Sequence, residues 1–194
     1  MSSGTQSSGT RRLRVAVIVG SVREGRFGTI VARWFADLAA GHGGIEVDVV
    51  DLADTPLALT MDGTGHEELG ERLAAADAFV VVTPEYNHSF PAGLKNMIDW
   101  FNREWHAKPV GFVSYGGLAG GLRAVEQLRV VFAELHAVTI RETVSFHGVW
   151  GHFDDAGALT EPKAATDAAT ALLNQLAWWA HALREARAAS PYVS

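Results

Sequence analysis

The chain has 194 residues, of which 48% are hydrophobic and 20% are charged, a composition that suits one domain with a substantial core. Its formal net charge of −6 disfavours nonspecific binding to nucleic acids or membrane surfaces, because both are anionic. The absence of cysteine excludes disulfides, thiolate nucleophiles and cysteine-ligated metal centres. No apolar run reaches the length of a membrane span.

The first ten residues are rich in Ser, Gly and Thr and lack the apolar core of a secretory signal. We therefore expect a disordered tail over residues 1–12 and a cytoplasmic location. A single domain is predicted over residues 13–188, and a short tail over residues 189–194.

The segment 14–19 is apolar and β-branched, which predicts a buried strand, and a helical pattern covers residues 29–40. The loop between them presents backbone N–H groups at a helix N-terminus, an arrangement that binds anions. Ser21 can add a hydroxyl donor, and Arg23 and Arg26 can add guanidinium groups suited to phosphate. The alternative for this loop alone is a solvated connector with two surface arginines.

Two familiar nucleotide motifs are absent from this loop. Gly20 and Gly25 have the spacing of a Walker A loop, but Arg26 and Phe27 replace its Lys and Ser/Thr, so no hydroxyl is left for magnesium. The pattern G-x-G-x-x-G is also missing. ATP hydrolysis and an ordinary dinucleotide fold lose support, whereas a bound phosphate monoester gains it.

The segment 45–50 alternates apolar and polar residues, as expected of a strand near a sheet edge. The stretch 53–65 is long for a turn and is either a lid or subunit contact, or a variable surface loop. A helix is predicted over residues 67–75.

An unbroken apolar run at residues 78–82 predicts a central strand covered on both faces. A polar and aromatic loop, 84–89, follows it, and a helix is predicted from Pro91 to Trp105 whose apolar face is either core or a homodimer seam. Ligands of open α/β sheets bind at the carboxyl ends of strands, so this loop is the first candidate for chemistry. An ordinary proline-stiffened turn is the alternative.

A further strand is predicted at residues 109–114, followed by four glycines within residues 116–121. Without Cβ atoms, this backbone can approach a flat ligand closely, although a flexible turn would also use glycine. A fifth strand is expected at residues 137–144, and a long helix at residues 163–187. His147 and His152, which lie between these two, do not have the spacing of a metal site, and none is expected.

Alternating strands and helices predict a doubly wound α/β fold with a five-stranded parallel sheet and helices on both faces. The strand order 2-1-3-4-5, which flavodoxin has with FMN at its switch point, would bring the loops after strands one, three and four together.

The motifs together resemble the NADPH-dependent FMN reductase family over residues 14–187. The resemblance implies a flavodoxin-like fold, FMN as cofactor and NADPH or NADH as electron donor. It also implies homodimers or homotetramers that reduce flavins, quinones, azo compounds or metal oxyanions. The segments that carry it are Gly20-Ser21-Val22-Arg23, Pro84-Glu85-Tyr86-Asn87, Leu94-Lys95-Asn96-Met97-Ile98-Asp99-Trp100 and 116–121.

The same resemblance implies which residues bind FMN. Ser21 and Arg23 would hold its phosphate, and the two later loops would border the flavin ring. Arg26 and Gly28 stand where relatives often have Ser and Asn, so Arg26 either compensates through its charge or points away. The expected cofactor-binding residues are Ser21, Arg23, Arg26, Phe27, Gly28, Pro84, Glu85, Tyr86, Asn87, Ser114, Gly116 and Gly117.

The implied reaction is hydride transfer from a nicotinamide to flavin N5, followed by electron transfer to a small acceptor. The cofactor carries this chemistry, so no catalytic side chain is expected, and the glycine-rich loop at residues 116–121 would stabilise charge on the reduced ring. The alternatives are a flavin-binding electron carrier or regulatory protein, and a phosphate-binding hydrolase. A hydrolase would need a nucleophile or metal constellation, and we find none in the sequence.

Overall fold

The computed structural model describes residues 11–62 and 65–193. The N-terminal tail predicted from the sequence therefore lies mostly outside the described residues. Strands and helices alternate through the described part, with one short 3-10 helix, η1, near its end. The elements are β1 (Leu13–Val19), α1 (Gly28–Gly41), β2 (Ile45–Asp51), α2 (Glu67–Ala75), β3 (Ala78–Pro84), α3 (Ala92–Trp100), β4 (Pro109–Gly116), α4 (Leu122–Glu134), β5 (Val138–His147), η1 (Val149–Gly151) and α5 (Pro162–Ala189).

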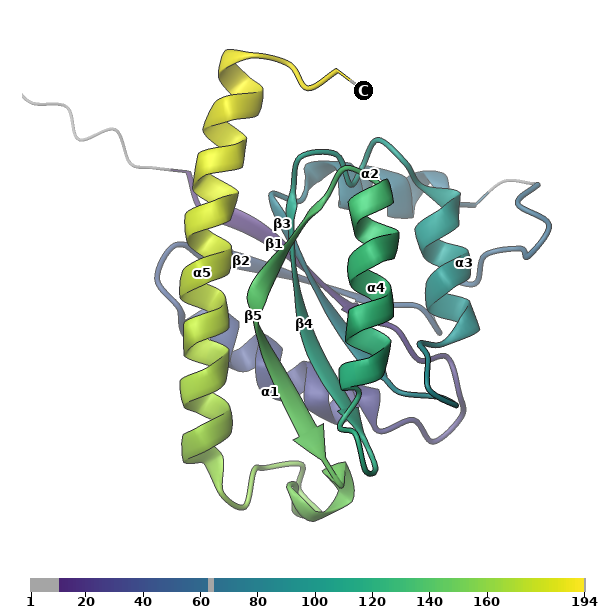
Figure 1. Cartoon of the computed structure of the whole chain (residues 1–194), viewed down its shortest axis with the longest axis vertical. Helices are drawn as coiled ribbons and strands as arrows, with labels where there is room; N and C mark the ends of the chain where they lie inside the picture. Colours follow the sequence, from purple (N-terminus) through teal and green to yellow (C-terminus); the bar gives the residue numbers. More distant parts are fainter. Residues whose placement is uncertain (1–10, 63–64, 194) are drawn as a thin grey trace, which may run out of the picture.

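The strands form one parallel sheet in the order β2-β1-β3-β4-β5. Every residue of β3 is buried, as the unbroken apolar run at its centre predicts. Strand β2 lies at the edge of the sheet, where Ile45 and Val50 are buried and Glu46 and Val49 are exposed, so its burial does not follow the alternation of its sequence. The doubly wound α/β class and the strand order are confirmed (Figure 1).

Helices cover both faces of the sheet (Figure 1). The apolar sides of α1 and α5 pack on one face, around Phe35 and Leu172, and those of α2, α3 and α4 pack on the other, around Leu73, Ile98 and Phe132. Burying one apolar stripe per helix against an apolar sheet is the main source of stability in this architecture.

The helix predicted from Pro91 to Trp105 is shorter in the structure, because α3 ends at Trp100. Phe101 adopts an extended conformation, and the Trp105 indole N–H donates to the carbonyl of Phe101 at 3.0 Å. Trp105 is fully buried all the same. The helical spacing of apolar residues correctly identified Phe101 and Trp105 as core residues, but both lie beyond the last residue of α3.

The parallel register places the carboxyl ends of the central strands at one edge of the sheet. Val19 of β1 is the partner of Val82 of β3, which is the partner of Val113 of β4. The loops that follow these three strands are therefore neighbours, as predicted. In the part of the chain that the structure describes, no helix has the length and apolarity needed to cross a membrane.

Candidate active site

The loop after β1 leads into an open helix N-terminus. No side chain caps the first turn of α1, and that turn contains no acidic residue. Arg23 is exposed on this loop, with its guanidinium 5.3 Å from the centre of the Tyr86 ring. Uncapped N–H groups at a helix start attract anions, and a mobile guanidinium beside them adds charge.

Arg26 is held in place by an ion pair. Its Nη2 lies 2.7 Å from an Asp51 carboxylate oxygen, and both side chains are largely buried. Its Nε is buried without a hydrogen-bond partner among the described residues. One edge of the guanidinium therefore fixes the loop to the end of β2, while one N–H donor remains unused. Whether Arg26 also compensates for the missing polar contacts to a phosphate stays a prediction.

Ser21 is fully buried, and its hydroxyl lies 2.7 Å from the hydroxyl of Tyr86. This contact joins the loop after β1 to the loop after β3. Ser21 thus orients Tyr86.

The loop after β3 contains a tight turn with an unusual backbone. Tyr86 and Ser89 exchange two backbone hydrogen bonds, of 2.8 and 3.1 Å, across Asn87 and His88. Both central residues have positive φ, 48° and 74°, as in a type I′ turn. Asn adopts this left-handed conformation readily, whereas in His the Cβ is brought close to the following carbonyl oxygen. A strained turn of this kind persists where surrounding contacts determine it.

Helix α4 supplies those contacts. Arg123 lies 2.6 Å from a carboxylate oxygen of Glu85, whose side chain is 8% exposed, and its Nη1 lies 2.9 Å from Nδ1 of His88. Gln127 donates to the carbonyl of His88 at 2.8 Å. The turn is thereby held against α4, and the negative charge of Glu85 is compensated.

The loop after β4 contains two glycines, Gly120 and Gly121, at which a side chain would clash. Gly120 and Gly121 have φ of 58° and 86°, and a Cβ at Gly121 would lie 2.6 Å from the Cβ of Ser114. The buried Ser114 hydroxyl donates to the carbonyl of Gly120 at 2.8 Å. Ser114 therefore shapes the loop from beneath. Gly117, by contrast, has open space around its missing side chain.

Tyr115 lies beneath these loops. A Cβ on Gly28 would be 2.6 Å from the Tyr115 hydroxyl, so the glycine at the start of α1 makes room for this ring. The hydroxyl is buried and has no hydrogen-bond partner among the described residues. Burial, with a smaller contribution from Tyr86, raises the pKa of Tyr115, so the hydroxyl stays protonated and able to donate.

A fourth segment, between β5 and α5, completes the site. Gly148 donates its backbone N–H to the carbonyl of Gly117 at 2.9 Å, which fixes η1 beside the glycine loop. Trp150 on η1 is 68% exposed and Val149 is buried.

These segments surround a cavity of about 500 Å³, which we call the carboxyl-edge cavity. Its volume lies within the range of small-molecule and cofactor pockets. The cavity is lined by Arg23, Glu24, Gly25, Arg26, Phe27, Pro84, Glu85, Tyr86, Tyr115, Gly116, Gly117, Val149 and Trp150.

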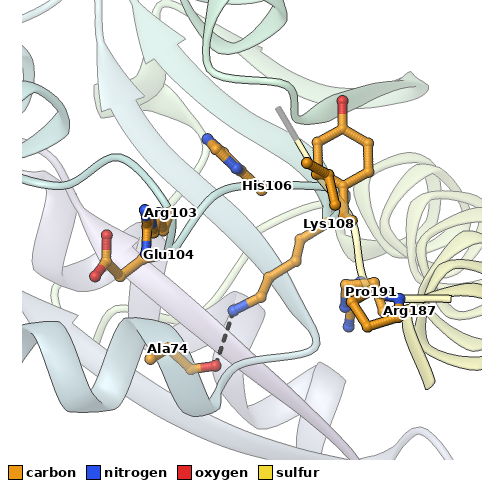
Figure 2. Close-up of a pocket in the computed structure, with 9 residues that line it drawn as sticks. Ala74, Arg103, Glu104, His106, Lys108, Arg187 and Pro191 are labelled. Atoms are coloured by element: carbon orange, nitrogen blue, oxygen red, sulfur yellow. Dashed lines mark hydrogen bonds between the residues drawn. The ribbon is translucent and has the colours of Figure 1, made fainter.

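A second cavity, of about 540 Å³, lies at the opposite end of the sheet and is called the amino-edge cavity. It adjoins Lys108, which immediately precedes β4, and Arg187 near the end of α5 (Figure 2). It contains neither glycine-rich loops nor strand carboxyl ends. Of the two cavities, the carboxyl-edge cavity therefore has the construction expected of a cofactor site in this fold.

Comparison with known proteins decides the family. Residues 13–151 match the family model described as NADPH-dependent FMN reductase. The chain belongs to this family. It is 36% identical over 152 residues to a quinone reductase of Escherichia coli, covering 72% of this chain and 80% of that protein. It is 38% identical over 120 residues to an NAD(P)H-dependent FMN reductase of Schizosaccharomyces pombe, covering 56% of this chain but only 60% of that protein.

Solved structures agree with the family. The flavoenzyme NAD(P)H:(acceptor) oxidoreductase FerB of Paracoccus denitrificans superposes with a TM-score of 0.69 at 26% identity, covering 86% of this chain and 98% of that chain. Flavodoxin 1 of Bacillus cereus superposes with a TM-score of 0.55 at 15% identity, covering 85% of this chain and 97% of that chain, which shows the fold alone.

The carboxyl-edge cavity fits the cofactor of an FMN reductase. One end offers an uncapped helix start, Arg23 and the unused Nε of Arg26, which suit a phosphate. The other end offers the backbone of Gly116 and Gly117, with open space around Gly117, which suits the edge of a planar ring. The Tyr115 hydroxyl has no hydrogen-bond partner among the described residues and is buried in the wall of the cavity, beside Gly28 at the start of α1. The cavity therefore offers anion-binding groups at one end and open backbone at the other, as an anionic, flat molecule requires.

The FMN contacts predicted from the sequence fall into two groups. Most line the carboxyl-edge cavity, namely Arg23, Arg26, Phe27, Pro84, Glu85, Tyr86, Gly116 and Gly117. The others, Ser21, Gly28, Asn87 and Ser114, are not among the lining residues, although Ser21 and Gly28 touch residues that are. Direct contact between FMN and any of the twelve stays a prediction.

Sequence reasoning did not select five lining residues, namely Glu24, Gly25, Tyr115, Val149 and Trp150. Glu24 and Gly25 lie between predicted site residues, and Tyr115 is the last large residue before the glycine loop, so their positions in the sequence could have indicated them. Val149 and Trp150 lie far along the chain with no motif to mark them. The pairing of His147 with Gly116 and the bond from Gly148 to Gly117 bring them to the site.

Proposed function

We propose that the protein is an FMN-dependent NAD(P)H oxidoreductase that reduces a quinone, a flavin or another small acceptor. The observation that carries the proposal is the cavity at the carboxyl ends of the strands, which joins Arg23 and the uncapped start of α1 to the glycine loop after β4. Two donors in its wall, Arg26 Nε and the Tyr115 hydroxyl, have no partner among the described residues. The relatives named above as FMN and quinone reductases support the same activity.

The residues of this chain bind and orient. The N-terminal turn of α1, Arg23 and Arg26 would hold the phosphate of FMN, and the Tyr115 hydroxyl would donate a hydrogen bond to the cofactor. The N–H groups of the loop of Gly116 and Gly117 would stabilise negative charge on the ring. When bound, FMN supplies the acceptance of hydride and the passage of electrons.

The positioning residues form a second set. Arg123 keeps Glu85 neutralised and the turn at Asn87 and His88 in place, and Ser21 orients Tyr86. Holding donor and acceptor in near-attack geometry is worth roughly 7 to 11 kcal/mol in favourable systems. No side chain needs to act as an acid or a nucleophile.

We extend the proposal to the setting of the reaction. Residues 13–188 act as one FMN-binding domain with short tails at both ends, in the cytoplasm, as a homodimer or homotetramer. The loop between β2 and α2 approaches α3 through the Trp100 indole, which donates to the carbonyl of Ala58 at 2.9 Å. This contact gives the loop a defined position on a surface that a second subunit could cover.

The proposal is tested by the visible spectrum. Purified protein reconstituted with FMN should show a bound-flavin absorption that bleaches under anaerobic NADPH or NADH and returns on addition of a quinone. A bound flavin that stays oxidised with both nucleotides would instead identify an electron carrier or a regulatory protein. No change in the FMN spectrum on mixing would reject the cofactor assignment.

A further inference from the structure

The amino-edge cavity gathers cations from separate parts of the chain (Figure 2). Lys108 comes from the start of β4, Arg187 from the end of α5, and Arg103 from the segment after α3. Figure 2 shows the Lys108 side chain extending toward Ala74, with Arg103 and Arg187 on opposite sides of it. The cavity is lined by Ala74, Arg103, Glu104, His106, Lys108, Arg187, Pro191, Tyr192 and Val193.

The Lys108 ammonium is buried without a salt bridge to the described residues. The residue is 6% exposed, and Nζ donates to the carbonyls of Leu73 and Ala74, each at 2.9 Å. These carbonyls lie in the last turn of α2, so the ammonium stabilises the C-terminus of α2. An ammonium has three donors, and no carboxylate of the described residues forms a salt bridge with this one.

Arg187 and Arg103 add charge that is also not paired. Arg187 donates to the backbone carbonyl of Ala107, and neither arginine forms a salt bridge within the described residues. Burial lowers the pKa of Arg187, with Asp77 opposing the shift, and burial followed by the charge of Arg187 lowers the pKa of Lys108. Three cations therefore adjoin one cavity, and none of them has a salt bridge to the described residues.

Two acidic groups lie near Lys108, and neither forms a salt bridge with it. Asp77, which is buried, accepts two hydrogen bonds from Arg11 and lies 3.6 Å from Arg184. Glu104 lines the cavity, and its carboxylate accepts the backbone N–H of Asn102 at 3.0 Å. These two charges raise the pKa of Lys108, but less than burial and Arg187 lower it, so they offset its charge only in part. His106, also in the wall, has its pKa lowered chiefly by burial and then by His136.

We propose that the amino-edge cavity binds a phosphate-bearing small molecule with more than one negative charge, held by Arg103, Lys108 and Arg187. Guanidinium groups bind phosphate through paired N–H donors, and lysine adds a compact charge. A cavity of about 540 Å³ has room for more than a single phosphate, and the exposed ring of Tyr192 offers a surface for an organic part. The site is separate from the carboxyl-edge cavity and does not rest on the proposed function.

Pyrophosphate titrated into FMN-saturated protein tests the proposal. With the first site filled by FMN, saturable binding of pyrophosphate should appear in calorimetry and raise the melting temperature at constant ionic strength. Arg103→Gln and Arg187→Gln should each weaken this binding about tenfold. Arg33→Gln, which removes an exposed charge from α1 on neither cavity, should leave it unchanged. If the chain does not retain FMN, the titration is done on Arg23→Gln protein instead. This substitution weakens binding of pyrophosphate in the carboxyl-edge cavity, so that the remaining signal comes from the amino-edge cavity.

A second readout separates a binding site from a structural lysine. Pyrophosphate should raise the pKa of the Lys108 ammonium, which NMR of ¹³C-labelled lysine reports directly. Equal weakening in all three arginine variants would show nonspecific attraction and overturn the proposal. So would an unchanged Lys108 pKa at saturating pyrophosphate, or no saturable binding at all, because Lys108 would then serve only to end α2.

Discussion

The two cavities are similar in size, at about 500 and about 540 Å³, but they are built differently. The carboxyl-edge cavity takes its polar groups largely from backbone turns that follow neighbouring strands, and two of its charged lining residues are paired, Arg26 with Asp51 and Glu85 with Arg123. The amino-edge cavity takes its polar groups from long cationic side chains that precede a strand or end a helix. Volume does not distinguish the two, whereas the origin of their donors does.

The origin of the polar groups indicates what each cavity can bind. Rigid glycine turns with unused N–H and O–H donors recognise the shape of a flat cofactor, which suits the family to which this chain belongs. Unpaired side-chain cations recognise charge and adapt to many anions. The following predictions change one cavity at a time, so that the other serves as its control.

The largest effect is expected from Gly121→Ala. The new Cβ would lie 2.6 Å from the Cβ of Ser114 and 2.9 Å from the backbone nitrogen of Tyr115, at a φ of 86°. We expect a loss of about 3 kcal/mol in the free energy of unfolding and no measurable FMN binding. Gly43→Ala, where nothing lies within 4 Å, should change stability by less than about 0.5 kcal/mol. Urea unfolding of both variants checks this, and equal stability would contradict the backbone geometry.

Lys108 predicts how stability depends on pH. Burial, followed by Arg187, lowers its pKa from 10.5 to about 8, so between these values the unfolded chain binds more protons than the folded one. The cost of burying the charge is full below about pH 8 and is relieved as the pH rises toward 10.5. Relative to Lys108→Met, the wild type should gain about 2 kcal/mol between about pH 7.5 and about pH 9.5.

Urea unfolding across this pH range measures the difference between the two proteins. FMN affinity should not differ between them at any pH, because Lys108 lies at the other edge of the sheet. A constant stability difference would show that the ammonium titrates normally in the folded protein.

Tyr115→Phe should separate binding from stability. Because the hydroxyl is buried without a partner, its removal should leave the free energy of unfolding of the FMN-free protein unchanged or raise it by up to about 1 kcal/mol. The affinity for FMN should fall about tenfold, the loss expected for one hydrogen bond to the cofactor. Fluorescence titration with FMN measures the affinity, and thermal melting of the FMN-free protein measures the stability.

The control is Tyr192→Phe, which removes a hydroxyl at the amino-edge cavity that lies 2.9 Å from Nδ1 of His136. It should leave FMN affinity intact. Loss of stability without loss of affinity in Tyr115→Phe would mean that the hydroxyl serves the fold.

The smallest energetic effect is expected from Trp150→Phe. Trp150 and Trp178 are similarly exposed, at 68% and 64%, but only Trp150 lines the carboxyl-edge cavity. Neither substitution should change stability by more than about 0.5 kcal/mol. The quenching of tryptophan fluorescence by FMN should lose a larger part of its amplitude in Trp150→Phe than in Trp178→Phe. Equal losses would place Trp150 away from the bound cofactor.

The sequence by itself determined the elements and their class. The apolar runs at β1 and β3 reflect burial on both faces of the sheet, which depends on local pattern alone. The loops after β1, β3 and β4 were found because glycine, proline and phosphate-binding side chains mark such turns wherever they occur. The end of α3 was missed because Trp105 reaches the core by a turn and not by a continued helix.

Only the tertiary structure decided which donors remain free. Ser21 is engaged by Tyr86 and Arg26 by Asp51, and both partners are distant in sequence. Tyr115 and Trp150 enter the carboxyl-edge cavity, and Lys108 meets Arg187, through packing of segments that carry no shared motif. Local propensity selects a residue's backbone conformation, but a binding site depends on which side chains have no partner after folding, and that is settled by contacts across the whole chain.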